Sequence, residues 1–318
     1  MNTFVNFLRA SILAGTPLLF GTLGEVISEK AGNLNLGVEG MMWVGALAGF
    51  YAAYTSQSVL LGIVAAFGAA ALCAALYAFL TVTVRANQNV AGLTLTTFGI
   101  GISLVLGYRM TGAIGGAPQI PAEVKSRLAA FELPLIHKIP YLGRVLEQGP
   151  LTWLAIALCA AAALVYGRTR LGLHVRAVGE NPAAADAAGI RVSLVKYASV
   201  ILGGGLCGIG GAFMSLVTGG GLWQPAGIVN GFGWIAVALV IFVRWNPMLA
   251  IPGAFVFGAF RSINHYVPDS VLSIPQAFYQ MLPFVLTIVV LLISSVRKQK
   301  GKNAQPAALG GNYFREER

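Results

Sequence analysis

One glycine-rich stretch of the sequence has the spacing of a dinucleotide-binding site. Gly203, Gly205 and Gly208 fit G-x-G-x-x-G, but that motif requires a preceding strand and a following helix in a soluble βαβ unit. Here the flanking residues form one continuous apolar run, so dinucleotide binding is excluded. Within the run, Gly204 and Gly208 have G-x-x-x-G spacing, which lets two membrane helices approach closely. We therefore predict tight helix packing at these glycines.

Other patterns that support catalysis or metal binding are missing from the sequence. There is no G-x-x-x-x-G-K-[ST] phosphate loop, no H-E-x-x-H and no G-x-S-x-G elbow. The three histidines and three cysteines have no metal-type spacing, and the eleven carboxylates lie mostly in loops and the tail, where no acid–base pair can be assembled. We expect a chain that is not an enzyme, has no metal site and binds no ATP by itself. A multispan membrane enzyme is disfavoured for the same reason.

The composition describes a membrane protein. The chain of 318 residues is 57% hydrophobic and only 10% charged, with a mean hydropathy of +0.75, whereas a soluble domain carries about 25% charged residues. Counted in spans of roughly 20 residues, the length accommodates about nine membrane helices. The net charge of +10 sits in short loops and at the C-terminal end, so it indicates membrane topology and not nucleic-acid binding.

Nine apolar runs are candidate membrane spans, and they predict an all-α, polytopic membrane helical bundle of about 8–10 transmembrane helices. The runs are residues 7–26, 36–54, 58–84, 90–108, 151–167, 195–217, 228–244, 247–264 and 276–296. The first run lacks the charge pattern and the cleavage site of a signal peptide, so we expect it to remain as a helix. Together the runs form one transmembrane domain over residues 1–296, followed by a basic cytoplasmic tail over residues 297–318.

Two long connections set the predicted orientation. Residues 168–194 hold four arginines against Glu180 and Asp186, and Lys and Arg beside membrane spans favour the cytoplasm. The C-terminal tail belongs on the same side, because an even number of spans separates the two segments. Counting back along the chain, residues 109–150 form an extracytoplasmic loop with a short surface helix, and the N-terminus lies outside.

Three apolar stretches are interrupted by glycines, amides and threonines: residues 31–40, 87–99 and 223–234. Irregular backbone at membrane depth is tolerated only where protein or a water-filled cavity covers it. Its recurrence in both halves of the chain indicates an inverted repeat with broken helices. For residues 31–40 a second interpretation remains, which is a cytoplasmic turn with Glu39 at the membrane interface.

Polar side chains in these stretches could line a pathway, because amides and hydroxyls form hydrogen bonds with a polar solute and still release it. The candidates are Asn33, Asn35, Glu39, Asn89, Thr94, Thr96, Thr97 and Asn230. Two alternatives stay open: a threonine inside a helix can bond back to its own backbone, and Glu39 can pair with Lys30 at the cytoplasmic rim. Trp223 and Trp234 lie near the ends of a run and are predicted as interface anchors.

Residues 176–190, RAVGENPAAADAAGI, contain the start and stop signals of a short helix. Asn181 can cap the free N–H groups of the first turn, and Pro182 suits the first helical position. The alanines favour helix, and Gly189 can end it by adopting a positive φ. The pattern predicts a compact helix of about two turns between two spans. It is either an ordinary capped loop helix or a small knob that seats in a partner's groove.

The same segment resembles the coupling helix of membrane permeases of ATP-binding-cassette (ABC) importers, in the branch that includes branched-chain amino acid, ribose-type sugar and nucleoside permeases. GEVISEKAGNLNLGVEGMMWVGAL (24–47) resembles the N-terminal signature of the nucleoside and simple-sugar subgroup, and GFGWIAVALVIFVRWNPMLAIPGAFVFG (231–258) resembles its later signature. The resemblance covers nearly the whole chain. It implies a multi-pass permease of the bacterial inner membrane that moves a nucleoside or related simple sugar into the cytoplasm.

The resemblance also implies partners within the lipid bilayer and on both sides of it. They are a second related permease chain, an ABC ATPase that binds ATP and Mg, and an extracytoplasmic substrate-binding protein. The residues that match the family's ATPase-coupling segment are Gly179, Glu180, Asn181, Ala183, Ala184, Asp186, Gly189 and Ile190.

Two alternative functions remain open. The first keeps the ABC permease class but changes the solute to a ribose-type sugar or a branched-chain amino acid. The second is an ion-coupled secondary transporter, which needs buried carboxylates for proton or sodium coupling. Runs 58–84, 90–108, 195–217 and 276–296 contain no Asp or Glu, and this absence disfavours the second alternative.

Overall fold

The computed structural model of the protein describes residues 2–131, 141–224, 227–263 and 304–314, together with Tyr266 and some positions between 278 and 292. Within these residues the chain is helical, with two isolated β-bridges and no strand. Eight of the nine predicted runs form helices: α1 (Asn2–Lys30), α2 (Val38–Ser56), α3 (Val59–Ala78), α4 (Gln88–Ile114), α7 (Pro150–Arg168), α10 (Val192–Phe213), α11 (Phe232–Phe242) and α12 (Pro247–Ser262). The ninth run, 276–296, lies largely outside the described residues.

Five helices in the described part of the chain are long and apolar enough to cross a membrane: Thr3–Lys30, Val59–Thr83, Gln88–Ile114, Pro150–Arg168 and Val192–Thr218. Two of them finish in π-helical turns, η1 (Phe79–Thr83) after α3 and η2 (Met214–Thr218) after α10. The remaining helices α2, α11 and α12 have 19, 11 and 16 residues. The predicted all-α membrane bundle is thereby confirmed, while the total number of spans stays a prediction.

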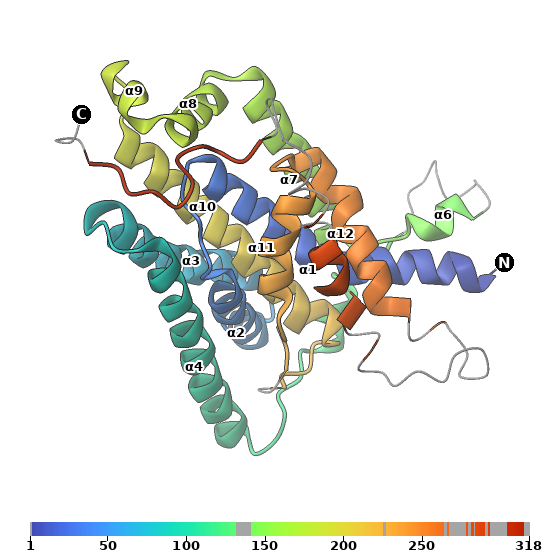
Figure 1. Ribbon diagram of the computed structural model, residues 1–318. Helices are drawn as coiled ribbons and strands as arrows, with labels where there is room; N and C mark the ends of the chain where they lie inside the picture. Colours follow the sequence, from blue (N-terminus) through green and yellow to red (C-terminus); the bar gives the residue numbers. More distant parts are fainter. Residues whose placement is uncertain are drawn as a thin grey trace.

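Two helices, α1 and α10, form the centre of the bundle. α10 packs against α1, α2 and α3, and α1 packs against α10, α11 and α12. Figure 1 shows α10 crossing the middle of the molecule and α4 at its edge. The most apolar window of α10 is 83% buried and that of α1 is 72% buried, whereas those of α3 and α7 are only 22% buried. The outer helices therefore leave apolar faces for lipid or for another chain.

The glycines of α10 allow the central helices to approach closely. A side chain at Gly208 would overlap the Ala66 carbonyl oxygen of α3, and a side chain at Gly204 would overlap the Ala74 methyl group. Gly45 of α2 faces Gly208 at the same crossing. The predicted close packing at the G-x-x-x-G spacing is confirmed, because the missing side chains are what permits backbone contact.

The two ends of the bundle carry different loops. At one end, called the loop end, Arg9 near the start of α1 pairs with Glu147 at 3.1 Å, and the Ile120 N–H group donates to the Gly221 carbonyl at 2.9 Å. The described residues of the predicted loop 109–150 lie here and include the short helices α5 (Ala122–Ser126) and α6 (Leu142–Val145).

At the opposite end of α1 lie α8 (Arg170–Glu180) and α9 (Pro182–Ala187), together with residues 304–314 (Figure 1). We call it the α9 end. The Ala308 N–H group donates to the Gly179 carbonyl there at 2.9 Å, and the Asn312 amide donates to the Arg85 carbonyl at 2.6 Å. Every described segment that the positive-inside rule assigned to the cytoplasm therefore meets at one end.

Trp223 is placed differently from the prediction. Its side chain is fully buried, and its ring centroid lies 5.4 Å from that of Phe50 on α2. The described residues of the loop 219–231 include Trp223 and Val229, both of which are fully buried in the bundle. The prediction of an interface anchor is therefore wrong for Trp223. Trp234 is 37% exposed, and its role as an interface anchor stays a prediction.

Replacing Gly208 with alanine should destabilise the bundle, because the added methyl group meets backbone atoms that cannot move aside; overpacking of this kind costs about 1–3 kcal/mol. Gly68→Ala on α3 is the matched control, because nothing lies within 4 Å of its added methyl group and alanine favours helix. Thermal unfolding in detergent should show a lower midpoint for G208A and an equal or higher one for G68A. Equal midpoints for the two variants would contradict close packing at this crossing.

Candidate functional site

The α8–α9 element contains the predicted coupling helix. The Asn181 side chain accepts a hydrogen bond from the Ala184 N–H group at 3.0 Å, and Pro182 occupies the first turn. Gly189 follows with φ +83°. The predicted cap, start and stop of the short helix are thus confirmed. Its six residues make slightly less than two turns, close to the predicted length, and Glu180 ends α8 just before the cap.

Sequence reasoning did not predict α8. Its first turn is capped by Thr169, whose hydroxyl oxygen accepts from the Gly172 N–H group at 3.2 Å. The segment alternates basic and apolar residues, so it carries no long apolar run. The capping threonine before it is the local signal that could have identified it.

One side of α9 is buried and the other is exposed. Val178, Ala185 and Val192 form a small apolar cluster, with Ile190 and Tyr313 packed against it. The exposed side is made of small residues, which are Ala184, Ala187, Ala188 and Gly189. The helix therefore presents a low-relief surface on a fixed base.

The predicted coupling residues divide between these two sides. Glu180, Asn181, Ala184 and Gly189 are exposed, and Ala183, Asp186 and Ile190 are half-buried. Gly179 is buried, and a side chain there would overlap the Lys30 carbonyl oxygen at the end of α1. Gly179 thus fixes the base of the element to α1 and does not contribute to its exposed face.

Residues 31–37 join α1 to α2 and are covered by protein. The Leu34 N–H group donates to the Gln88 side chain at 2.8 Å, and its carbonyl accepts from the Tyr77 hydroxyl at 2.5 Å. The Leu36 carbonyl accepts from the Thr96 hydroxyl at 2.8 Å. The segment is a connection between two helices at the α9 end, as the second interpretation held, but side chains from α3 and α4 bond its backbone.

Glu39 holds the start of α11. Its two carboxylate oxygens accept from the Gly231 N–H group at 2.9 Å and from the Gly233 N–H group at 2.7 Å. A negative charge at a helix N-terminus is favourable, because the first N–H groups there have no partner within the helix. Glu39 is only 4% exposed, so protein covers its carboxylate. The alternative pairing with Lys30 is not formed, and the Lys30 ammonium lies over the Tyr166 ring.

The short helix α11 begins inside the bundle. Eleven residues at 1.5 Å each span about 16 Å, roughly half of the 30 Å apolar thickness of a bilayer. Its far end is tied to α1, since the Trp245 indole N–H donates to the Glu29 carboxylate at 2.5 Å. This arrangement fits the predicted broken helices, in which half-helices start near the membrane centre.

Glu25 and Glu29 form a buried acidic pair that sequence reasoning missed. They lie one turn apart on α1 and are at most 2% exposed. Glu25 accepts from the Asn35 N–H group at 2.8 Å. The predicted first run ended at residue 26, so the two carboxylates fell at its edge. Their i, i+4 spacing near the end of an apolar run was the available signal.

The predicted pathway residues do not converge in one cavity. Asn33, Asn35, Glu39 and Thr96 are buried around residues 31–37, and Asn33 donates to the Thr81 hydroxyl at 3.4 Å. Asn89, Thr94, Thr97 and Asn230 are exposed. Thr94 and Thr97 bond back to carbonyl groups of their own helix, as the alternative for threonines predicted.

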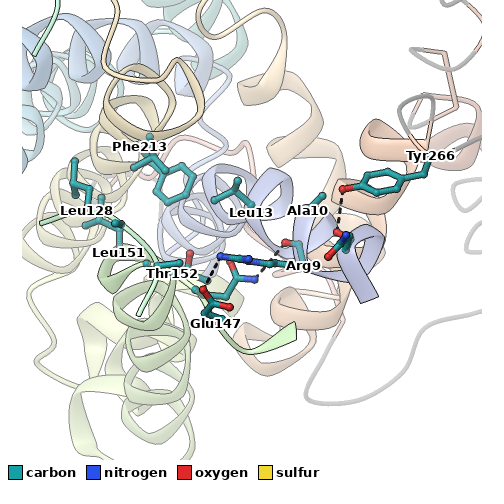
Figure 2. A pocket seen from close by; sticks show the side chains of 15 residues that line it. Arg9, Ala10, Leu13, Leu128, Glu147, Leu151, Thr152, Phe213 and Tyr266 are labelled. Atoms are coloured by element: carbon teal, nitrogen blue, oxygen red, sulfur yellow. Dashed lines mark hydrogen bonds and ion pairs between the residues drawn. The ribbon is translucent and has the colours of Figure 1, made fainter. Parts of the chain in front are cut away.

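A cavity of about 410 Å³ opens at the loop end. Figure 2 shows the Arg9–Glu147 ion pair in the middle of its lining, with Tyr266 on one side of the pair and Thr152 and Phe213 on the other. A groove of about 730 Å³ lies between α2 and α4 and is lined mainly by apolar side chains. None of the predicted pathway residues lines either hollow. Among the described residues, no three His, Cys, Asp or Glu side chains are grouped to hold a metal ion.

Comparison with known proteins identifies the family. Residues 7–291 match the family described as the permease component of the branched-chain amino acid transport system. TsgC13 of Haloferax volcanii, named as a glucose ABC transporter permease protein, is 35% identical over 99% of both chains. The nucleoside ABC transporter permease protein NupC of Lactococcus lactis is 34% identical over 99% of this chain and 98% of its own. NupB, a nucleoside ABC transporter permease protein of the same organism, is 28% identical over 48% of this chain and 45% of its own.

The family match covers most of the chain, and the matches to TsgC13 and NupC cover 99% of it. The resemblance stated from the three sequence stretches is confirmed. The chain is an ABC transporter permease subunit and belongs to the family of branched-chain amino acid transport permease components.

Proposed function

We propose that this permease subunit moves a nucleoside or a related simple sugar into the cytoplasm, driven by a separate ABC ATPase that docks on α9. The observation that carries the proposal is the form of α9. It is a short helix with an exposed face of small residues, held on a buried base that contacts α1 and α10. Such a unit moves as a body when a partner pushes it, and the attached helices move with it.

The solute class follows from the relatives and from the polar residues on the outside of α4. The similar permeases are named for nucleosides and glucose, and both solutes carry a hydroxyl-rich ring. Asn89, Thr94 and Thr97 lie on the exposed side of α4, where a second permease chain would close a pathway between the two subunits. The Asn89 amide offers a donor and an acceptor to a sugar or a base edge, whereas the Thr94 and Thr97 hydroxyls, which donate to their own helix, offer acceptor oxygens.

The partners and the orientation belong to the same proposal. Lactococcus lactis has two similar nucleoside permease proteins, NupB and NupC, which supports pairing with a second related permease chain. The α9 end, with its arginines and residues 304–314, faces the cytoplasm of a bacterial cell, and the ATPase there binds ATP and Mg. The loop end, with the cavity beside Arg9, faces an extracytoplasmic substrate-binding protein.

An ion-coupled transporter is less well supported. The buried carboxylates of Glu25, Glu29 and Glu39 each accept a hydrogen bond from a fixed N–H group elsewhere in the fold. The contacts of Glu25 and Glu29 connect α1 to residues 31–37 and to Trp245, and the contacts of Glu39 connect α2 to the start of α11.

Uptake by the reconstituted complex tests the function. The permease pair, ATPase and binding protein in proteoliposomes should accumulate a labelled nucleoside or simple sugar only when ATP is present on the ATPase side. Branched-chain amino acids and a ribose-type sugar complete the panel, and an imposed proton or sodium gradient without ATP is the control. Accumulation driven by the gradient alone would refute the proposal.

Charge reversal at Glu180 tests the docking surface. Glu180→Arg changes an exposed side chain beside α9, so insertion and thermal unfolding should not change, while ATPase association should weaken roughly tenfold or more. Glu123→Arg, an exposed glutamate at the loop end, is the matched control and should bind the ATPase normally. Equal association of both variants would remove α9 from the ATPase contact.

Glu39→Gln tests the start of α11. Glutamine has a single side-chain acceptor oxygen, so its NH₂ group would face the Gly231 or Gly233 N–H group, and an unsatisfied buried donor costs about 1–3 kcal/mol. We expect a lower unfolding midpoint and reduced uptake, with ATPase association retained. Glu123→Gln should change none of these. An unaltered midpoint for E39Q would show that Glu39 does not anchor α11.

A further inference from the structure

The C-terminal segment of residues 306–314, here called the strap, crosses the α9 end of the bundle (Figure 1). The Ala308 N–H group donates to the Gly179 carbonyl at 2.9 Å. The Asn312 amide donates to the Arg85 carbonyl at 2.6 Å, and the Arg85 guanidinium lies 4.8 Å from the centre of the Phe314 ring. The strap therefore contacts the α8–α9 element and the turn before α4.

Gln88 connects the strap to the segment between α1 and α2. Its amide nitrogen donates to the Gly311 carbonyl at 3.2 Å, and its amide oxygen accepts from the Leu34 N–H group at 2.8 Å. The side chain is only 3% exposed, so water competes little for either bond. One buried amide thus joins the strap to residues 31–37.

Tyr313 connects the strap to α9. Its hydroxyl group donates to the Asp186 carboxylate at 2.9 Å, and its ring packs on the cluster of Val178, Ala185 and Val192. These contacts lie on the buried side of α9. Ala184, Ala187, Ala188 and Gly189 on the other side remain exposed, so the strap supports the helix without covering its free face.

We infer that the strap is a second link from α9 to the α1–α2 segment, and that Tyr313 and Gln88 are positioning residues for coupling. The link runs from Asp186 through Tyr313 and Gly311 to Gln88 and Leu34, beside the covalent route through α8 and α10. It transmits a displacement of α9 to α2 and α4, which border the proposed pathway. This inference rests on the proposed function, because it assigns the strap a part in ATPase coupling.

The polar contacts distinguish this role from simple covering of apolar surface. A covering segment would need only the Tyr313 ring, whereas the link needs its hydroxyl group and the Gln88 amide. Tyr313→Phe removes the hydroxyl group and keeps the ring. Tyr266→Phe is the matched control, since that hydroxyl donates to the Asn6 carbonyl at 3.1 Å at the loop end.

Hydrogen–deuterium exchange of the full chain in nanodiscs tests the link without the ATPase. We expect Y313F to speed exchange of the α9 amides about fivefold, the effect of losing one hydrogen bond, and Gln88→Leu to do the same through the strap. The double variant should show less than the product of the two effects, because both break one connection. Unchanged α9 exchange in Y313F, or fully multiplicative effects, would overturn the inference.

The assembled importer tests coupling itself. Y313F should raise the ATP hydrolysed per solute transported about fivefold, with the unfolding midpoint and ATPase association unchanged, and Y266F should also leave that midpoint and that association unchanged. An unchanged ratio would leave the strap as a structural support and refute its role in coupling. If the wild-type chain never binds an ATPase, the proposed function fails, and the exchange experiment still decides whether the strap holds α9.

Discussion

Inside an apolar bundle, a backbone N–H or C=O group that leaves a helix has to find its partner within the protein, because the bilayer offers none. The chain leaves the helical pattern at residues 31–37 and again before α11. Gln88, Tyr77 and Thr96 bond the first segment, and Glu39 bonds the second. In both segments, polar side chains from other helices therefore satisfy backbone groups that lack a partner within a helix.

Close steric packing, rather than hydrogen bonding, holds the central helices of the bundle together. The α10 glycines let α2 and α3 approach until backbone atoms touch, and such interfaces resist deformation because they contain no free volume. The polar segment 31–37 depends in addition on individual hydrogen bonds from side chains of α3 and α4. A displacement at the α9 end is therefore expected to rearrange residues 31–37 before it disturbs the α2–α10 crossing.

The sequence predicted those features that depend on residues close together in the chain. Apolar runs located α3, α4 and α10 because membrane thickness sets helix length, and α9 was predicted because Asn181, Pro182 and Gly189 act within one turn. The partners of Glu29 and Glu39 lie about two hundred positions away in sequence, since the indole of Trp245 bonds one and the start of α11 bonds the other. No spacing rule connects such positions, so these contacts required the folded structure.

The stability of α9 explains why distant parts of the chain gather around it. An isolated helix shorter than about 12 residues is marginal in water, and α9 has six. Its order must come from its base, which Val178 and Val192 supply from the flanking helices and Tyr313 supplies from the strap. The proposed ATPase contact is thus one exposed face of a composite built from residues 176–192 and the C-terminal strap. The residues of the 176–190 signature supply the cap and the alanines of the exposed face. Tyr313 of the strap, which supports the buried side, lies 127 positions after Asp186.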